Sequence, residues 1–486
     1  MRRLSLILTA VFFACGLWAK DIVIYHTSDT HGYYFAKEDE NGRMQGGFAA
    51  LAAFIKKDSK GQANYLLLDS GDFMQGNLEA NDSKGMTSAR VYNAMGYHAV
   101  TIGNHEFDFG ASVYDVTKSM DAKVLAANFL SIGTTQEYEI FNVDGVKIGV
   151  VGIGLNGGKN KTFKERDTIE SYKSAMAEVY KNDVNAVVVL THSSDYDIRD
   201  GNPPKEIAAS SPLKAHVMLG GHRHIEASAI ADGTLFAESG TQLKSVSKII
   251  MTFDDDTNVF KSAKHEKVPL YIDAVGEDAA IKTILDGIKN PEYEKVIGRL
   301  ENSFYYTNNE PGRLDSQLGN LMADIVKDSV EDADIGILNS TSFRNILPKG
   351  KITVRDLVLS MPYNKLSTIK LSGDFIANLL ITTVMPNFSL FQYSGLEADI
   401  IFDGDKPRHA IIKINGEPLQ KNKVYNVATN EFIAFYGTYE AAAFKDIPAE
   451  DKEKFETEIH DLLMQFIAEF PDQAPDKEPR LRTISK

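Results

Sequence analysis

The pattern of apolar and polar positions divides the chain into two regions. From Lys20 to about Phe260, short apolar runs alternate with longer amphipathic segments, which is the pattern of an α/β layer protein. Residues 46–57 and 86–96 carry apolar side chains at helical spacing, and residues 140–153 resemble a hairpin turning at Asp144 and Gly145. The clearest strand candidates are residues 21–26, 64–69, 97–102, 123–128, 185–190 and 215–220.

The pattern changes after Pro269. Residues 277–297 are predicted to form a helical connector, and a helix at 318–330 is followed by a strand at 333–339. Residues 449–470 are predicted to form one amphipathic helix. We therefore expect an α/β domain at residues 20–270, a connector at 271–300 and a smaller α+β domain at 301–486.

Length and charge limit the classes of protein. A chain of 486 residues is too long for one ordinary core, so more than one domain is expected. The formal net charge of -15 argues against a protein that binds nucleic-acid polymers, because such proteins cluster Lys and Arg against the phosphates. A small anionic substrate is compatible with this charge if a local positive group receives it.

The first residues resemble an export signal. Arg2 and Arg3 precede the apolar residues 4–14, and Ala19 is a suitable last signal residue. This predicts a signal peptide at 1–19 and a periplasmic or secreted protein. The alternatives are a lipid anchor on Cys15 and a buried N-terminal helix. No segment of the mature chain is long and apolar enough to be a transmembrane helix, and cleavage would remove the only cysteine, so disulfides are excluded.

Metal-competent side chains recur where apolar runs end. In an open α/β sheet, loops at the carboxyl ends of parallel strands share one edge, so side chains far apart in sequence converge there. A lone Asp-x-His is more often a capped turn, and the neighbouring glycines suit any tight turn, but five such loops in order predict a single site. The groups are Asp29 and His31, Asp69 and Asp72, Asn104 to Asp108, His192, and His222 with His224.

The ligand types indicate two divalent ions. Carboxylate, imidazole and amide groups without thiolates suit ions such as Zn, Mn or Fe. Two such ions about 3.5–4 Å apart can share a carboxylate and hold a hydroxide for in-line attack on phosphorus. The six other histidines of the eleven are interpreted as structural or surface residues.

These motifs resemble the calcineurin-like metallophosphoesterases, whose pattern is D-x-H, G-D, G-N-H-[DE], a further His and G-H-x-H. The segment "MGYHAVTIGNHEFDFG" resembles the bacterial 5'-nucleotidase family, exported enzymes that include UDP-sugar hydrolases and 2',3'-cyclic phosphodiesterases. The resemblance implies a four-layer α/β/β/α metallophosphoesterase domain followed by an α+β substrate-binding domain. It also implies one metal held by Asp29, His31, Asp72 and His224, and another held by Asp72, Asn104, His192 and His222.

The same resemblance implies roles for the G-N-H-E loop. His105 would stabilise the phosphoryl group and donate a proton to the leaving oxygen, and Asp108 would orient the His105 ring. Glu106 is expected to point away as a turn or surface group. Some family members have Gln at the position of His224, so the identity of the metal stays open.

In the second half, the family pattern implies a substrate pocket with Arg344 on the phosphate and Phe391 and Phe432 stacked on the base, with Phe388 as an alternative to Phe391. The glycines of that pattern are replaced here by Thr341, Ser342 and Tyr436. We therefore expect a dinuclear-metal phosphoesterase of the 5'-nucleotidase type. The alternatives are a phosphodiesterase for cyclic nucleotides or nucleotide sugars, and a non-catalytic exported binding protein.

Overall fold

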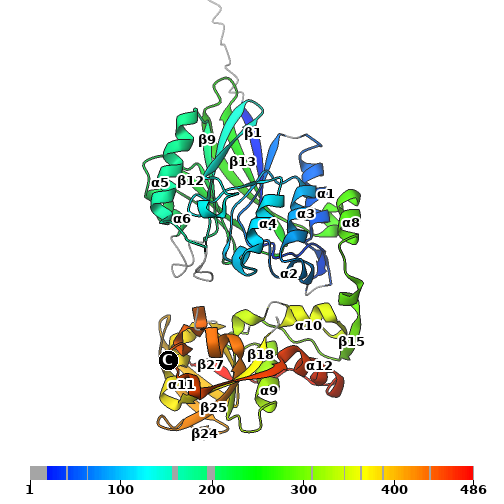
Figure 1. Ribbon diagram of the computed structural model, residues 1–486, viewed down its shortest axis with the longest axis vertical. Helices are drawn as coiled ribbons and strands as arrows, with labels where there is room; N and C mark the ends of the chain where they lie inside the picture. The colour runs from blue at the N-terminus through cyan, green and yellow to red at the C-terminus, as the bar shows by residue number, and fades with distance from the viewer. Residues whose placement is uncertain are drawn as a thin grey trace, which may run out of the picture. The chain divides into compact units, whose positions relative to one another are not determined.

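The computed structural model describes residues 19–39, 42–62, 64–155, 163–193, 203–307, 310–343, 345–361, 364–385, 388–436 and 439–484. The signal peptide predicted at 1–19, Cys15 and Arg344 therefore lie outside the described residues, apart from Ala19. The chain divides into two compact units, residues 1–289 and 290–486 (Figure 1). Among the described residues, no helix has the length and apolar character needed to cross a lipid bilayer.

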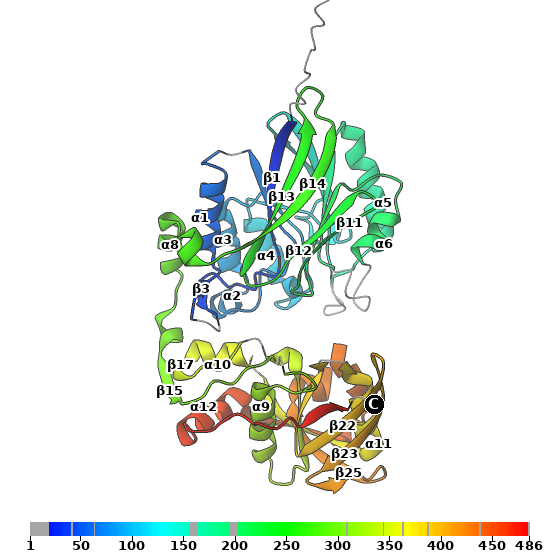
Figure 2. The same cartoon turned by 180° about the vertical axis from the view of Figure 1, so that it is seen from behind.

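Two six-stranded sheets form the centre of the first unit (Figures 1 and 2). The first has the order β14-β13-β1-β4-β5-β6, and the second has the order β11-β12-β10-β9-β8-β7. The strands of the first sheet are β1 (Ala19–Thr27), β4 (Tyr65–Asp69), β5 (Ala99–Val100), β6 (Lys123–Val124), β13 (Ser245–Asp254) and β14 (Phe260–Pro269). Those of the second are β7 (Tyr138–Val143), β8 (Val146–Ile153), β9 (Ala186–Thr191), β10 (Val217–Gly220), β11 (Glu226–Ala231) and β12 (Thr234–Ser239). A small hairpin, β2 (Lys37–Glu38) with β3 (Met44–Gln45), lies outside them.

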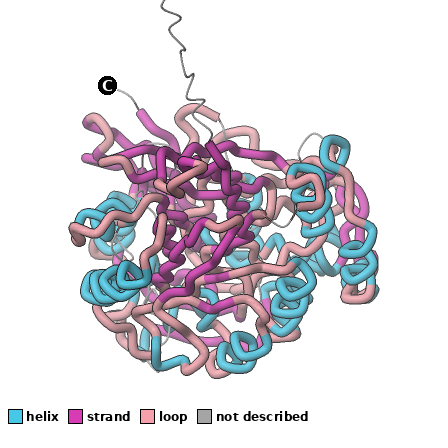
Figure 3. Tube along the Cα trace, turned by 90° about the horizontal axis from the view of Figure 1, so that it is seen from above, coloured by secondary structure: helices cyan, strands magenta, loops and turns pink. Residues whose placement is uncertain are grey.

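Helices cover the outer faces of both sheets, as Figure 3 shows in cyan and magenta. An apolar core lies between the sheets, where Ile24 and Leu68 of the first belong to one cluster with Val150 and Val188 of the second. Separate cores join each sheet to its helices. This arrangement confirms the predicted four-layer α/β/β/α architecture. The helices are α1 (Phe48–Asp58), α2 (Leu78–Asp82), α3 (Met86–Met95), α4 (Ser112–Ser119), α5 (Thr168–Val179), α6 (Pro204–Ala209), α7 (Ile272–Val275) and α8 (Ala279–Asp286).

Strand direction positions the loops of the site. β1, β4, β5 and β6 run parallel, and so do β8, β9, β10 and β12. Their carboxyl ends therefore meet at one edge of each sheet. β7 and β8 form the predicted hairpin, and its turn residues Asp144 and Gly145 have φ of 50° and 79°, as a tight two-residue turn requires.

The second unit has an α+β fold. A five-stranded sheet has the order β21-β16-β25-β18-β26, and a four-stranded sheet has the order β24-β23-β22-β27. The strands of the first are β16 (Ile335–Asn339), β18 (Lys365–Ser372), β21 (Phe391–Ser394), β25 (Val424–Asn430) and β26 (Lys452–Glu458). The others are β22 (Leu396–Asp403), β23 (Lys406–Ile414), β24 (Glu417–Pro418) and β27 (Leu481–Ile484), with the pairs β15 (Val296–Leu300) with β17 (Gly350–Thr353) and β19 (Val384–Met385) with β20 (Phe388–Ser389). The helices are α9 (Gln317–Asp328), α10 (Val354–Ser360), α11 (Gly373–Thr383) and α12 (Ile459–Glu469).

The prediction of one helix over residues 449–470 is wrong for its first half. Residues 452–458 form the edge strand β26, which pairs antiparallel with β18, and only Ile459–Glu469 is α-helical. The backbone N–H and C=O groups of the β18 edge select the extended conformation here, although Lys and Glu favour helices. Within the expected connector, Ile272–Val275 and Ala279–Asp286 are α-helical, and Pro291–Glu294 forms a short 3₁₀ turn.

Candidate metal centre

The seven predicted ligands converge at the carboxyl ends of the strands. Asp29 and His31 follow β1, Asp72 follows β4, and Asn104 begins the 3₁₀ turn after β5. His192 follows β9, and His222 and His224 follow β10. Two groups result, in each of which the ligand atoms lie within 4.8 Å of one another: Asp29, His31 and His224, and Asp72, His192 and His222.

Short distances join the two groups into one cluster. His192 Nε2 lies 3.0 Å from Asp72 Oδ2 and 3.8 Å from Asp29 Oδ1. The Nε2 atoms of His31 and His224 lie 3.0 Å apart, and His31 Nε2 is 3.9 Å from Asp72 Oδ2. Asn104 Oδ1 lies 2.9 Å from His222 Nδ1. Asp72 is therefore placed between the two groups, where a shared ligand would be.

The residues fit divalent ions. The His192 side chain is 0% exposed, and its Nε2 lies 3.0 Å from Asp72 Oδ2 but makes no hydrogen bond of good geometry with any described residue. Buried polar atoms almost always have a partner, so a bound ion would account for this one. The imidazole, carboxylate and amide donors form a set that suits Zn, Mn or Fe rather than a structural thiolate site.

The backbone at the site is unusual. Five of the seven residues have positive φ, although few non-glycine residues adopt it: Asp29 (51°), His31 (48°), Asp72 (59°), His222 (78°) and His224 (58°). Such conformations cost free energy and persist where the surrounding structure imposes them. The loops are thus held in shapes that aim these side chains inward.

Glycines are needed here for close approach. A Cβ atom at Gly103 would lie 2.2 Å from Asp72 Oδ1, and one at Gly221 would lie 2.8 Å from Asp29 Oδ2 and 2.0 Å from Ser28 Oγ. Any larger residue would therefore displace a predicted ligand or its hydrogen-bond partner, because Ser28 Oγ donates to Asp29 Oδ2 at 2.6 Å. These two glycines serve the site as well as the turn.

Electrostatics make the cluster attractive to cations. Burial alone would raise the pKa of Asp72, but His192 and His105 hold it well below its usual value. Burial would lower the pKa of His192, yet Asp72 and Asp29 raise it to about 10. Burial raises the pKa of Asp29 to about 6. The carboxylates therefore create a strong negative potential that stabilises positive charge.

His105 and Asp108 form a pair at the rim of the cluster. His105 Nδ1 lies 2.5 Å from Asp108 Oδ2, and the exposed fractions of the two side chains are 14% and 22%. The backbone N–H of His105 donates to Asp72 Oδ1 at 2.8 Å, so the ring is tied to the cluster. The His105 and His31 ring centroids are 5.2 Å apart. This geometry has the features of an oriented imidazole beside a reaction centre.

The expectation that Glu106 points away is wrong. Its side chain is 0% exposed, and its carboxylate accepts hydrogen bonds from four backbone N–H groups. Asp69 is also buried; it accepts hydrogen bonds from Thr27 and Tyr92, and burial raises its pKa to about 8. Asp69 belongs to neither ligand group. The spacing of the motif signalled chemistry at this loop but not which way the Glu106 side chain turns.

The predicted substrate residues lie in the second unit. Phe391 is 0% exposed and packs edge-on against Phe444, which favours a core role over base stacking, whereas Phe388 is 41% exposed. Phe432 is half-buried, and its ring stacks on Tyr436 with centroids 6.0 Å apart. The stretch Phe432–Tyr436 is one π-helical turn.

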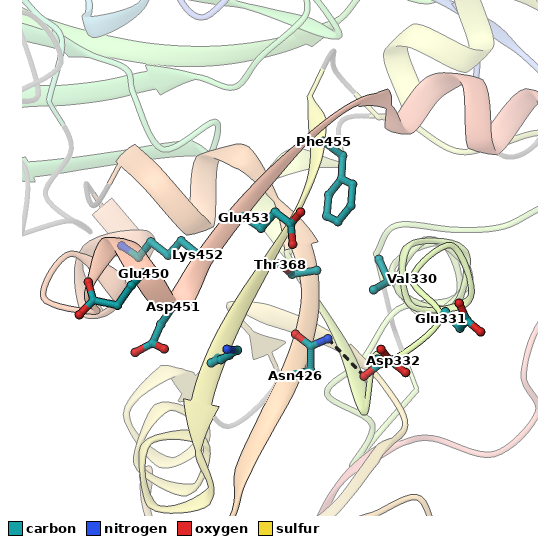
Figure 4. A pocket seen from close by; sticks show the side chains of 11 residues that line it. Val330, Glu331, Asp332, Thr368, Asn426, Glu450, Asp451, Lys452, Glu453 and Phe455 are labelled. Carbon is teal, nitrogen blue, oxygen red and sulfur yellow. Dashed lines mark hydrogen bonds between the residues drawn. The ribbon is translucent and has the colours of Figure 1, made fainter.

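A cavity of about 300 Å³ in the same unit is separate from these residues (Figure 4). Thr368 and Lys370 of β18, Asn426 of β25 and the residues Glu450 to Glu453 are among those that line it. None of the predicted substrate residues is among its described lining residues. The cavity therefore adds no support to the predicted substrate pocket.

Comparisons with known proteins agree with the geometry. The family described as "Calcineurin-like phosphoesterase" matches residues 22–226, and "5'-nucleotidase, C-terminal domain" matches residues 296–446. The trifunctional nucleotide phosphoesterase protein YfkN of Bacillus subtilis is 25% identical over 92% of this chain, which spans only 34% of that relative. Protein UshA of Yersinia enterocolitica is 24% identical over 90% of this chain and 91% of its own length.

The crystal structure of a 5'-nucleotidase precursor from Thermus thermophilus shares the fold. It superposes with a TM-score of 0.82 at 23% identity, covering 96% of this chain and 99% of that one. The first unit thus has the fold and the metal-competent cluster of a calcineurin-like metallophosphoesterase. With the second match added, the chain belongs to the 5'-nucleotidase family of these hydrolases.

Proposed function

We propose that this protein is an exported dinuclear-metal phosphoesterase that hydrolyses nucleotides. The observation that supports it most directly is the pair of ligand groups at the carboxyl ends of the strands, with Asp72 Oδ2 of one group 3.9 Å from His31 Nε2 of the other. The names of the relatives, a nucleotide phosphoesterase and 5'-nucleotidases, support a nucleotide substrate. The N-terminal residues that resemble a signal peptide support action outside the cytoplasm.

In this proposal, different residues of the site bind the metal ions, transfer a proton and bind the substrate. Asp29, His31, Asp72 and His224 would hold one ion, and Asp72, Asn104, His192 and His222 the other. Two such ions supply positive charge for the phosphoryl oxygens and activate water for attack on phosphorus. His105, oriented by Asp108, would stabilise the negative charge that develops on the phosphoryl group and give a proton to the leaving oxygen. Arg344 and Phe432 would hold the phosphate and the base.

The test is phosphate release by the purified protein from AMP, UDP-glucose, 2',3'-cyclic AMP and an aryl phosphate, with Mn²⁺, Zn²⁺ or a chelator. A coupled phosphatase reports cleavage of the diesters. We expect release from AMP in the presence of metal and none with the chelator. Release from the aryl phosphate alone would keep the metal centre but reject the nucleotide substrate.

Two variants test the site itself. Asp72→Asn removes the shared carboxylate and His192→Ala removes a buried imidazole, so each should lower AMP hydrolysis to the level seen with the chelator while circular dichroism stays unchanged. His265→Ala is the matched control, because His265 lies on β14 and contacts Ser247 rather than the cluster. Full activity in a folded Asp72→Asn protein would reject the proposed centre.

A non-catalytic binding protein is the second candidate. Its support is the replacement of the family's glycines by Thr341, Ser342 and Tyr436 in the predicted substrate region. This candidate requires that AMP binds without phosphate release at any metal concentration. Calorimetric titration of AMP beside the release assay separates the two candidates.

A further inference from the structure

The Glu106 carboxylate is buried and surrounded by backbone donors. Its Oε2 accepts hydrogen bonds from the N–H of Gly103 at 2.6 Å and of Asp72 at 2.8 Å. Its Oε1 accepts from Phe73 at 2.8 Å and from Met74 at 3.0 Å. Each oxygen thus takes two donors, which uses the acceptor capacity of an ionised carboxylate fully.

These bonds join two loops that carry predicted ligands. Gly103 belongs to the loop after β5 that holds Asn104 and His105, and residues 72–74 belong to the loop after β4 that holds Asp72. Asp72 has φ of 59°, and its peptide N–H points at Glu106 while its side chain points at His192. The same side chain accepts the backbone N–H of His105 through Oδ1. Asp72 is therefore held from both ends by the Gly103–Glu106 turn.

We infer that Glu106 is a positioning residue for Asp72, fixing the shared carboxylate so that both metal ions are held as a coupled pair. This inference rests on the proposed function, because it assumes that Asp72 binds both ions. Glu106 itself reaches neither ligand group. Its effect on the centre passes through the backbone of residues 72–74.

The donor pattern makes Glu106→Gln a sharp test. A glutamine amide has one acceptor oxygen, so in either orientation its NH₂ group faces two backbone N–H groups. Either the pair at Gly103 and Asp72 or the pair at Phe73 and Met74 then loses its acceptor inside the protein. The loop after β4 must shift to recover a partner, and Asp72 shifts with it. Glu106→Asp keeps the charge but is one methylene shorter, so its effect should be smaller.

The experiment measures Mn²⁺ binding by equilibrium dialysis and the electron paramagnetic resonance spectrum of the loaded protein. Wild type should bind two ions and show the exchange-split spectrum of a coupled pair. Glu106→Gln should bind the second ion at least tenfold more weakly and lose the coupled spectrum, with Glu106→Asp between the two. AMP hydrolysis at saturating Mn²⁺ should show a lower kcat with little change in KM.

Asp58→Asn is the matched control. Asp58 is a part-buried carboxylate of the same unit that accepts from Tyr25 and Lys248, outside the ligand loops. It should lower the melting temperature without changing the spectrum, which is what a purely structural carboxylate does.

A folded Glu106→Gln protein with wild-type second-ion affinity and spectrum would overturn the inference alone. If Glu106→Gln does not fold, wild-type values in Glu106→Asp would overturn it instead. A wild-type protein that shows no pair of bound ions would reject the proposed function as well, so the two failures are distinguishable.

Discussion

The contact between His105 and Asp108 explains the orientation of the His105 ring. The Asp108 carboxylate lies 2.5 Å from His105 Nδ1. This contact fixes the orientation of the ring and leaves Nε2 as the nitrogen that does not face Asp108. A carboxylate in this position also stabilises the protonated imidazole. In the proposed mechanism, Asp108 therefore orients His105 and stabilises its protonated form, which is the proton donor.

Asp108→Asn tests this pair. The amide can no longer stabilise a charged His105, so kcat for AMP should fall about 10- to 100-fold with KM nearly unchanged. Steady-state assays at saturating Mn²⁺ measure both constants. Asp115→Asn, an exposed carboxylate in the first turn of α4, is the control and should have wild-type kinetics. Equal kinetics for the two variants would remove Asp108 from the mechanism.

His216 contributes to stability through its protonation. Burial and the nearby Lys214 lower its pKa to about 4. Its Nδ1 accepts the N–H of Val187 at 3.0 Å, which requires this nitrogen to be unprotonated. In the unfolded chain a histidine has a pKa of about 6.5. Between about pH 6.5 and 4 the unfolded chain therefore binds a proton at His216 that the folded protein does not bind. The free energy of unfolding falls as the pH falls through this range.

His216→Gln should reduce this pH dependence, because glutamine can accept the same N–H but does not titrate. Urea unfolding at pH 7.5 and pH 5 measures the difference. Wild type should lose about 2 kcal/mol more than the variant between the two values. If both proteins lose the same unfolding free energy between pH 7.5 and pH 5, folded His216 binds its proton as readily as the unfolded chain does.

At the scale of elements, short loops after parallel strands hold the predicted ligands of the first unit and predicted substrate residues of the second. In the second unit, β16 and β25 run parallel, and the loops after them hold Thr341, Ser342 and Phe432. Asn430 Nδ2 donates to Asn339 Oδ1, which also accepts from Ser342, so the two loops are fixed to each other. Ser342, which replaces a glycine of the family pattern, thus adds a hydrogen bond within the β16 segment, to the same Asn339 oxygen that Asn430 contacts.

Phe432→Leu tests the stacking role of the loop after β25. A half-buried leucine keeps apolar packing but removes the ring face, so KM for AMP should rise about 5- to 100-fold, the equivalent of roughly 1–3 kcal/mol of stacking. KM for glycerol phosphate, which has no ring, should stay the same. Phe435→Leu, at a residue that is 45% exposed, is the control. Equal KM for AMP in all three proteins would exclude Phe432 from the base site.

The molecule as a whole consists of two compact units, and all seven predicted ligands lie in the first. A ligand that binds only the folded form of one unit stabilises that unit by mass action. Scanning calorimetry should therefore show two transitions, of which Mn²⁺ shifts only one. At 100 times the dissociation constant, the stabilisation is about 2.7 kcal/mol.

The Asp72→Asn variant shows which unfolding transition belongs to the first unit. In this variant the Mn²⁺-dependent shift should be much smaller, while the other transition keeps its wild-type temperature. A metal-dependent shift of both transitions in wild type would show that the units do not unfold independently. Isolated unit 290–486 is not needed for this measurement, because the intact chain provides its own reference.

The order of apolar runs and polar loops along the chain was sufficient to predict an α/β unit and the convergence of its metal-competent loops. Each run is long enough for one strand, and parallel strands place their carboxyl ends together whatever the details of packing. The candidate loops could be located because metal-competent residue types occur directly after those runs. The choice of seven ligands among those residues came from the resemblance to the calcineurin-like metallophosphoesterases. The Phe391 ring could not be placed in this way, since an aromatic residue in a strand has the same local pattern whether it faces a ligand or the core.

Two features were decided only by the tertiary structure. Residues 452–458 have helical propensity but form a strand, because the free edge of β18 offers hydrogen bonds that are not local in sequence. Glu106 has the polarity of a surface residue but is buried, because four backbone N–H groups from two loops meet at one point. Local periodicity thus determined the strands that carry the predicted ligands, whereas the partners available after folding decided that residues 452–458 form an edge strand and that Glu106 is buried.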